Sequence, residues 1–277
     1  MISGCMRVRR EGMRLALGFL SNIALALLAM NQGARAADLV SPAEPPAPIE
    51  IVNDWKFQLT LYGWATSLDG EVGVRGLDPV DVDVSFKEIL ENLDGAVMGS
   101  FYATNGRFVV LTDLVWAKIS DEVDVGPFGG TVSFEQRQLI ASAVGGYVLP
   151  LDVPGLQLSP VAGIRYNRLK AEVEFNPALL PVTFEEEGTK NWVDPIVGAL
   201  AHYDFDENWF VNLYADVGGF GVGSDLTAQG FASIGYRWSD TISTAVGYRV
   251  LYTDYDKDGF VYNMTQHGPY MGLGIHF

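Results

Sequence analysis

Alternation of apolar and polar positions is the most regular pattern in this chain. In the last ten residues, one parity carries Pro269, Met271, Leu273, Ile275 and Phe277, while glycine or polar side chains fill the other. The same period of two recurs in segments that start near Trp55, Leu156, Trp209 and Thr241, and it is weaker at 96–104 and 108–116. A period of two is typical of β-strands that present one apolar face and one polar face.

Tight turns and longer connections alternate between these segments. Asn105-Gly106 predicts a type I′ hairpin turn, other tight turns are predicted at 206–208 and 239–240, and a somewhat longer one is predicted at 150–155. Glycine-rich or acidic connections fall between them, at 126–130, 176–188, 220–225 and 254–259. Short periplasmic turns that alternate with longer extracellular loops are typical of outer-membrane barrels. The pattern predicts an all-β, transmembrane, antiparallel up-and-down β-barrel from residue 55 to 277, with about ten strands or, as the alternative, eight.

Aromatic residues gather at the expected periplasmic strand ends. They share the lipid-facing parity and are Trp55, Tyr147, Tyr203, Phe205, Trp209, Trp238 and Phe277. Amphipathic rings settle at the boundary between lipid and water, so this placement supports a membrane barrel. We further predict that Phe277, as a terminal aromatic residue on an alternating strand, is the signal read by the barrel assembly machinery.

The N-terminal region predicts export. Four arginines precede a nearly uncharged run at 15–30, and Ala34-Arg35-Ala36 supplies a small-residue cleavage pattern, so residues 1–36 are predicted to be a signal peptide. Residues 37–54 are proline-rich and predict an extended periplasmic tail. The expected location is therefore the cell outer membrane of a Gram-negative bacterium.

Charge narrows the classes of partner. The 277 residues include 18 Lys and Arg against 34 Asp and Glu, a formal net charge of −16. A chain this acidic lacks the basic patch that a nucleic-acid backbone requires, so nucleic-acid binding is excluded. Outer-membrane lipid and lipopolysaccharide are the expected partners, together with the assembly machinery.

Three stretches resemble a family. Residues 61–70 (LYGWATSLDG), 82–94 (VDVSFKEILENLD) and 248–277 look like small Gram-negative outer-membrane barrels of the opacity-protein or porin-like type. The resemblance covers nearly the whole chain after the predicted signal peptide. It implies the barrel fold and a surface or porin-like role, without an assigned substrate.

A short amphipathic helix is expected in the first long loop. Ser85 and Glu88 match a capping box, and apolar residues follow at helical spacing, namely Phe86, Ile89, Leu90 and Leu93. The helix either folds into the barrel mouth as a plug or packs on a hairpin formed by residues 71–84. Both alternatives stay open from the sequence.

Charged residues are placed inside the barrel by parity: Arg165, Arg237, Arg249, Asp194 and Asp216. Charges in a lumen either line an aqueous passage or pair across it and close it. The first outcome predicts a small porin-like passive channel for hydrophilic solutes or ions. The second predicts a closed structural or surface-interaction barrel that acts in envelope integrity, adhesion or ligand binding through acidic loops.

Two further candidates concern metal and catalysis. Asp254, Asp256 and Asp258, followed by glycine, match the opening half of a calcium loop, but Thr265 stands where the acidic twelfth ligand is expected. A solvated hairpin tip is the alternative, and no other cofactor is expected. Thr265 and His267 share the lipid face and keep open a remote alternative, a lipid hydrolase. The sequence otherwise predicts that the protein is not an enzyme.

Overall fold

The computed structural model describes residues 55–73, 79–124, 130–177 and 184–277. The predicted signal peptide and proline-rich tail lie outside the described residues. No helix within the described ranges is long and apolar enough to cross a membrane.

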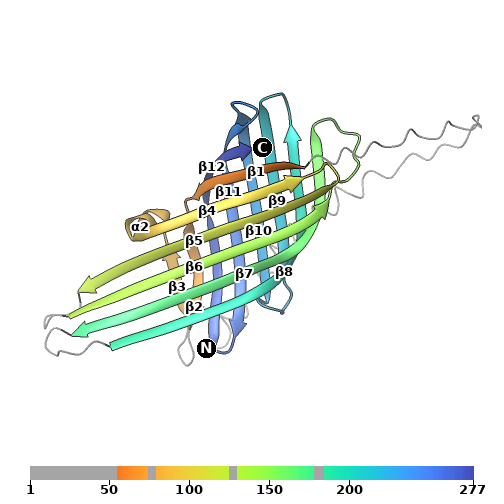
Figure 1. Cartoon of the computed structure of the whole chain (residues 1–277). Coiled ribbons are helices and arrows are strands. Elements are labelled where there is room, and N and C mark those ends of the chain that lie inside the picture. Colours follow the sequence, from red (N-terminus) through yellow and green to blue (C-terminus); the bar gives the residue numbers. More distant parts are fainter. Residues whose placement is uncertain (1–54, 74–78, 125–129, 178–183) are drawn as a thin grey trace, which may run out of the picture. The chain divides into compact units, whose positions relative to one another are not determined.

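Ten antiparallel strands close into a barrel, which confirms the predicted fold class and strand number (Figure 1). Each barrel strand pairs with the next in the chain, and β1 pairs with β12 to close the circle. The barrel strands are β1 (Lys56–Trp64), β4 (Leu93–Thr104), β5 (Phe108–Asp124), β6 (Gly130–Tyr147), β7 (Leu156–Pro177), β8 (Phe184–Asp204), β9 (Trp209–Gly219), β10 (Leu226–Arg237), β11 (Ile242–Lys257) and β12 (Phe260–His276).

Two additional strands extend the wall on one side. β2 (Ser67–Gly73) takes over from β1 along β12, since Trp64 pairs with Tyr270 and Ser67 pairs with His267. β3 (Val80–Val84) then pairs with β2 only. The first long connection of the barrel is therefore a β-hairpin followed by a short helix.

The predicted connections need three corrections. Asn105 does not adopt the positive φ that a type I′ turn requires; its side chain instead accepts hydrogen bonds from the backbone N–H groups of Arg107 and Phe108. β11 and β12 continue through the expected loop at 254–259 and leave only Asp258 and Gly259 between them. The expected loop at 176–188 is also shorter, because β8 already begins at Phe184.

Four neighbouring strands are much longer than a membrane requires. β5, β6, β7 and β8 have 17, 18, 22 and 21 residues, whereas about 9–11 residues cross a bilayer as a tilted strand. Figure 1 shows these four strands sweeping away together on one side. Their outer ends therefore form a sheet that projects beyond the membrane at the loop end, by which we mean the end that carries the β2–β3 hairpin; the opposite end is the turn end.

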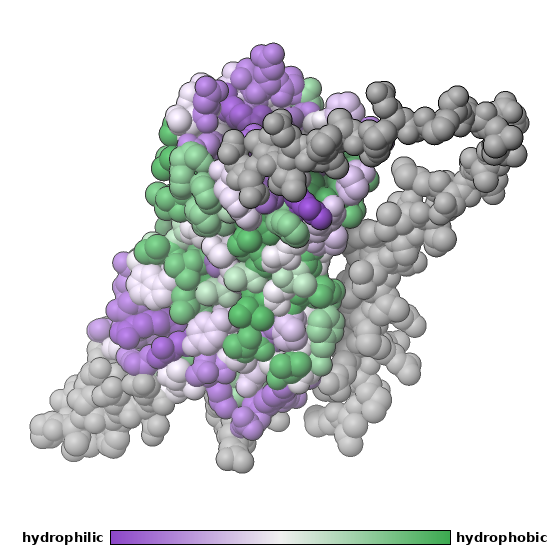
Figure 2. All heavy atoms as spheres, turned by 45° about the vertical axis from the view of Figure 1, so that its right-hand side comes forward, coloured by the Kyte–Doolittle hydropathy of each residue, from purple (hydrophilic) through white to green (hydrophobic). Residues whose placement is uncertain are grey.

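The outward face carries an apolar belt, which appears as a green band between purple ends in Figure 2. Large hydrophobic side chains are exposed there on nine of the ten barrel strands, among them Leu61, Val97, Leu114, Ile164, Val197, Leu213, Ile234, Val246 and Leu273, while β6 exposes Tyr147 at its turn end. The predicted aromatic residues are exposed at the turn end, where Phe57 stacks on Phe277 and Trp209 meets Tyr236 edge to face. An exposed apolar belt bordered by aromatic rings is the surface that a lipid bilayer covers.

Inward-facing glycines let neighbouring strands approach closely. A Cβ on Gly163 would lie 1.9 Å from the carbonyl oxygen of Ala143 on β6, and one on Gly198 would lie 2.2 Å from that of Ala215 on β9. Glycine is required at such points because no side chain fits between the two backbones.

The helix α2 (Phe86–Glu91) forms where the capping box predicts it, but it does not plug the mouth. No residue of α2 is buried, and Leu90 is 54% exposed. Helix α2 contacts β2, and the backbone N–H of Phe86 donates to the hydroxyl of Ser67. Of the two predicted alternatives, the plug is thus wrong and packing on the hairpin is confirmed: the helix sits outside the lumen on the β2–β3 hairpin, Ile89 is only partly covered, and Leu93 belongs to β4.

Candidate functional site: the sealed lumen

Arg165 is the centre of the polar interior. It projects from β7 and is fully buried, as is its ion-pair partner Asp216 on β9, whose carboxylate accepts from the Arg165 Nη2 at 2.6 Å. The other guanidinium N–H groups donate to Ser142 on β6 and to Thr227 and Gln229 on β10. Burial of a guanidinium is tolerated only when it is paired and hydrogen-bonded in this way.

A second arginine extends this arrangement across the lumen. Arg249 on β11 donates to Asp113 on β5 at 2.8 Å and to Tyr62 on β1 at 2.9 Å, and it lies over the Trp64 ring at 4.7 Å. The Gln229 side-chain oxygen accepts from Arg249 at 2.8 Å and from Arg165 at 3.2 Å. Because β5 and β10 lie five places apart in a ring of ten strands, this network spans the full width of the barrel.

Apolar layers lie beyond the network toward the loop end. Trp64, Val115, Ile140 and Leu251 are buried against one another. Three of them follow a network residue by two positions on strands that run outward, and Ile140 precedes Ser142 by two because β6 runs in the opposite direction. Farther out, Trp192 packs on Tyr255 with ring centroids 4.4 Å apart, beside Tyr262 and Met264. The outer half of the lumen is therefore filled by side chains.

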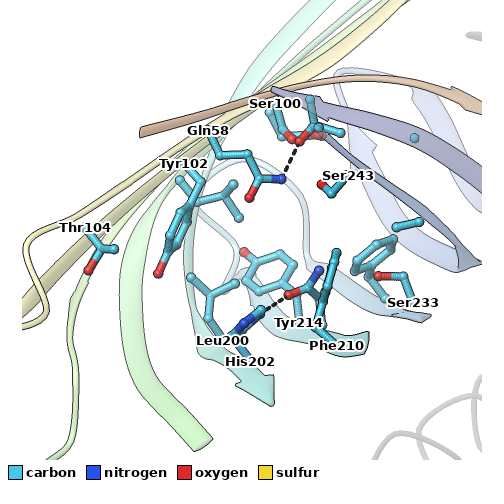
Figure 3. Close-up of a pocket in the computed structure, with 18 of the residues that line it drawn as sticks. Gln58, Ser100, Tyr102, Thr104, Leu200, His202, Phe210, Tyr214, Ser233 and Ser243 are labelled. Atoms are coloured by element: carbon cyan, nitrogen blue, oxygen red, sulfur yellow. Dashed lines mark hydrogen bonds between the residues drawn. The ribbon is translucent and has the colours of Figure 1, made fainter. Parts of the chain in front are cut away.

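The half of the lumen near the turns is hollow instead. Its cavity of about 760 Å³ reaches from the mouth at Phe277 and Thr241 to a floor formed by Asp113, Gln229 and Arg249. Figure 3 shows aromatic and neutral polar side chains around it, with Gln58, Tyr102, Phe210, Tyr214, Ser233 and Ser243 among those labelled. We call this cavity the vestibule.

The structure divides the five predicted lumen residues into separate groups. Arg165, Asp216 and Arg249 share the network. Arg237 lies at the vestibule mouth, where it pairs with Asp204 at 2.5 Å and contacts His202. These five residues therefore do not form the polar lining of a single passage.

Asp194 is inward-facing as predicted but holds a loop. Its carboxylate accepts from the backbone N–H and the hydroxyl of Ser224, at 2.6 and 2.5 Å, and from Trp192 and Asn167. A Cβ on Gly223 would lie 2.5 Å from the same carboxylate. Asp194 thus fastens the connection between β9 and β10 over the barrel.

The network residues that sequence reasoning missed are Asp113, Gln229 and Tyr62. Asp113 lies in the segment 108–116, where alternation is weak because inward Val109, Leu111 and Val115 are as apolar as the lipid-facing residues. The signal that could have identified Asp113 is its position as an isolated acidic residue between apolar neighbours. Tyr62 shares the parity of Lys56 and Gln58, so alternation already placed it inward.

The remaining candidates are not assembled into sites. Among the residues that the structure describes, no three His, Cys, Asp or Glu side chains gather as a metal would require, and Asp254 and Asp256 lie within β11 rather than in a loop. The prediction of a calcium loop at Asp254, Asp256 and Asp258 is therefore corrected, because two of these residues belong to a strand. His267 contacts Tyr248 and Asp69, each at 2.7 Å, and not Thr265. Phe277 closes the sheet by two backbone hydrogen bonds with Phe57, while its role in assembly stays a prediction.

The apolar belt, the aromatic border and the polar interior together decide the class. The protein is a β-barrel of the outer-membrane type. No family model matches the chain, and no curated protein matches it in sequence. The family resemblance seen in the sequence is therefore supported only at the level of an outer-membrane barrel.

Several solved structures are similar to this barrel. They include the outer-membrane protease OmpT from Escherichia coli, with 11% identity, 82% of this chain and 98% of that chain covered and a TM-score of 0.45. The translocator domain of the autotransporter NalP from Neisseria meningitidis has 12% identity, coverage of 99% and 98%, and a TM-score of 0.42. The attachment invasion locus protein Ail of Yersinia pestis has 9% identity, coverage of 80% and 98%, and a TM-score of 0.33. These likenesses assign no activity to this chain.

Proposed function

We propose that this protein is a closed outer-membrane barrel that acts through its surfaces, as a structural or surface-interaction protein, rather than a passive channel. The observation that carries the proposal is the network that joins Arg165 to Asp113 through Gln229 and Arg249. Both arginines are buried and paired, so opening the lumen would break both ion pairs and the hydrogen bonds through Gln229 that join them. The long outer ends of β5–β8 supply the surface for interactions outside the cell. The proposal assigns no catalysis to the chain.

The apolar layer gives independent support. A hydrated solute that passed Arg249 would next meet Trp64, Val115, Ile140 and Leu251, whose side chains are 4% exposed or less. Water and ions do not cross such a packed apolar layer without a rearrangement of the side chains. The small porin-like channel remains the competing hypothesis, and it requires that the network and this layer open together.

Single-channel recording in a planar bilayer tests the proposal. The mature protein is refolded, and its folded state is verified by heat-modifiable mobility on a gel. We expect no conductance steps from the intact protein, nor from a variant that lacks residues 86–91, because α2 lies outside the lumen. A double variant, Trp64→Ala with Arg249→Ala, removes side chains from both sealing layers, and we expect steps from it. Stable steps from the intact protein would overturn the proposal and favour the channel.

A further inference from the structure

Basic side chains form a row on the outward face of the projecting sheet. Lys118 on β5 is the cross-strand partner of Arg137 on β6, which is the partner of Lys170 on β7. Arg168 lies two residues before Lys170 on the same face. We call Lys118, Arg137, Arg168 and Lys170 the basic row. Their parity is that of the exposed Leu114 and Ile164, whereas Arg165 and Asn167 on the other face are buried.

The basic row begins where the apolar belt ends. The rung that contains Arg168 also contains Trp116 and Leu139, and the next rung outward is Lys118, Arg137 and Lys170. The rung after that contains Ser120, Glu135 and Glu172. Moving outward along the sheet, the order is thus apolar, basic, acidic, which is the order expected where strands leave the hydrocarbon region and pass the lipid headgroups.

Like charges on directly paired strand positions repel one another, so this row needs anions nearby. Lys118 contacts Asp94 at 3.1 Å and Glu135 at 2.8 Å, Arg137 pairs with Glu135, and Lys170 pairs with Glu172. Arg168 is exposed and has no ion pair within the described ranges of the chain. Within the described residues, Asp94, Glu135 and Glu172 lie against Lys118, Arg137 and Lys170, so Arg168 is the cation of the row that is left to pair with an external anion.

We propose that the basic row binds the phosphate groups of the outer-leaflet glycolipid. A phosphate at headgroup level approaches from the membrane side, where it meets Arg168 and the basic rung before the carboxylates. Arginine and lysine at the edge of the hydrocarbon region attract anionic headgroups, and guanidinium groups bind phosphate oxygens through two N–H groups. This lipid site depends on the position of the barrel in the membrane and does not depend on a sealed lumen. Conductance therefore tests the proposed function, and lipid binding tests the lipid site.

Lipid binding by the refolded protein in neutral detergent tests this inference. The probes are bisphosphorylated lipid A, the same lipid without its phosphates, and inorganic phosphate, with complexes measured by native mass spectrometry. We expect the phosphorylated lipid to bind more tightly than the dephosphorylated one. Inorganic phosphate at millimolar concentration should compete weakly, because it lacks the acyl chains that lie against the apolar belt.

Variants locate the site. Each basic side chain near an anionic surface contributes about fivefold in affinity, so Arg168→Gln with Lys170→Gln should weaken binding of lipid A roughly 25-fold. Lys87→Gln is the matched control, since Lys87 is an exposed cation on α2 at the same end of the barrel, and it should change affinity less than about twofold. The single variant Arg168→Gln changes only an exposed side chain, so it should fold normally, and it should weaken binding about fivefold.

Three results would overturn the assignment. Equal affinity for the phosphorylated and dephosphorylated lipids would remove the role of phosphate. Unchanged affinity in the Arg168 variants would place the binding elsewhere. Equally tight binding of inorganic phosphate and lipid A would identify a site for a small anion instead of a glycolipid.

Discussion

Replacement of Arg165 by methionine is the sharpest test of the lumen network. Methionine keeps much of the aliphatic volume but removes the guanidinium, and Asp216 is left with its carboxylate buried and without its cation. The neutral partners lose less, since Thr227 still donates to the carbonyl of Tyr252 and Gln229 still accepts from Arg249. The cost of the substitution therefore falls mainly on Asp216.

The expected loss of stability follows from this geometry. Removing one member of a buried ion pair costs about 3–5 kcal/mol, because the partner charge stays in a low-dielectric site. With a urea dependence of about 2 kcal/mol per molar, the unfolding midpoint should fall by roughly 1.5–2.5 M. The double variant Arg165→Met with Asp216→Leu removes both charges and should recover most of this loss.

Urea unfolding of the refolded protein in detergent micelles, followed by tryptophan fluorescence and by gel mobility, measures these shifts. The control is Arg168→Met on the same strand, where the side chain is exposed and the change should stay within about 0.5 kcal/mol. A loss below about 1 kcal/mol for Arg165→Met, or a double variant that is no more stable than the single one, would refute the reasoning.

Three further predictions concern the periphery of the barrel. Asp194→Ala removes the acceptor that holds the β9–β10 connection, so limited proteolysis of that connection should become about tenfold faster. An unchanged rate would show that Asp194 does not hold the connection in place. The hydroxyl and backbone N–H of Ser85 lower the pKa of Glu88. The cap is therefore complete above the ordinary glutamate pKa of about 4.3 and is lost as the pH falls through the lowered value, so amide protection of Ser85 should decrease on acidification in the native protein but not in Glu88→Gln. Gly163→Ala places a Cβ against a backbone carbonyl and should prevent the heat-modifiable fold from forming, whereas Gly188→Ala, with open space around it, should fold normally.

The fold was accessible from the sequence because membrane strands alternate strictly. A residue such as Leu273 must face lipid and its neighbour Gly274 must face the lumen, so a period of two and the spacing of turns determine both strand number and sidedness. The capping box at Ser85 determined the start of α2 for a similar reason, since both of its hydrogen bonds are local. Each of these signals depends on residues that are close in the chain.

Tertiary structure decided which inward residues meet and whether the lumen stays open. Parity placed Arg249 inside, but only the closed sheet brings it to Asp113, which lies 136 residues away in the chain. Parity likewise placed both Asp194 and Arg165 in the lumen, although Asp194 holds a loop and Arg165 pairs with a residue on another strand. The helix at 86–91 was local and predictable, whereas its docking on β2 outside the lumen depends on how the β2–β3 hairpin pairs with β12. Alternation determines whether a side chain faces lipid or the lumen. Its partner across the barrel is determined only when the ring of strands closes.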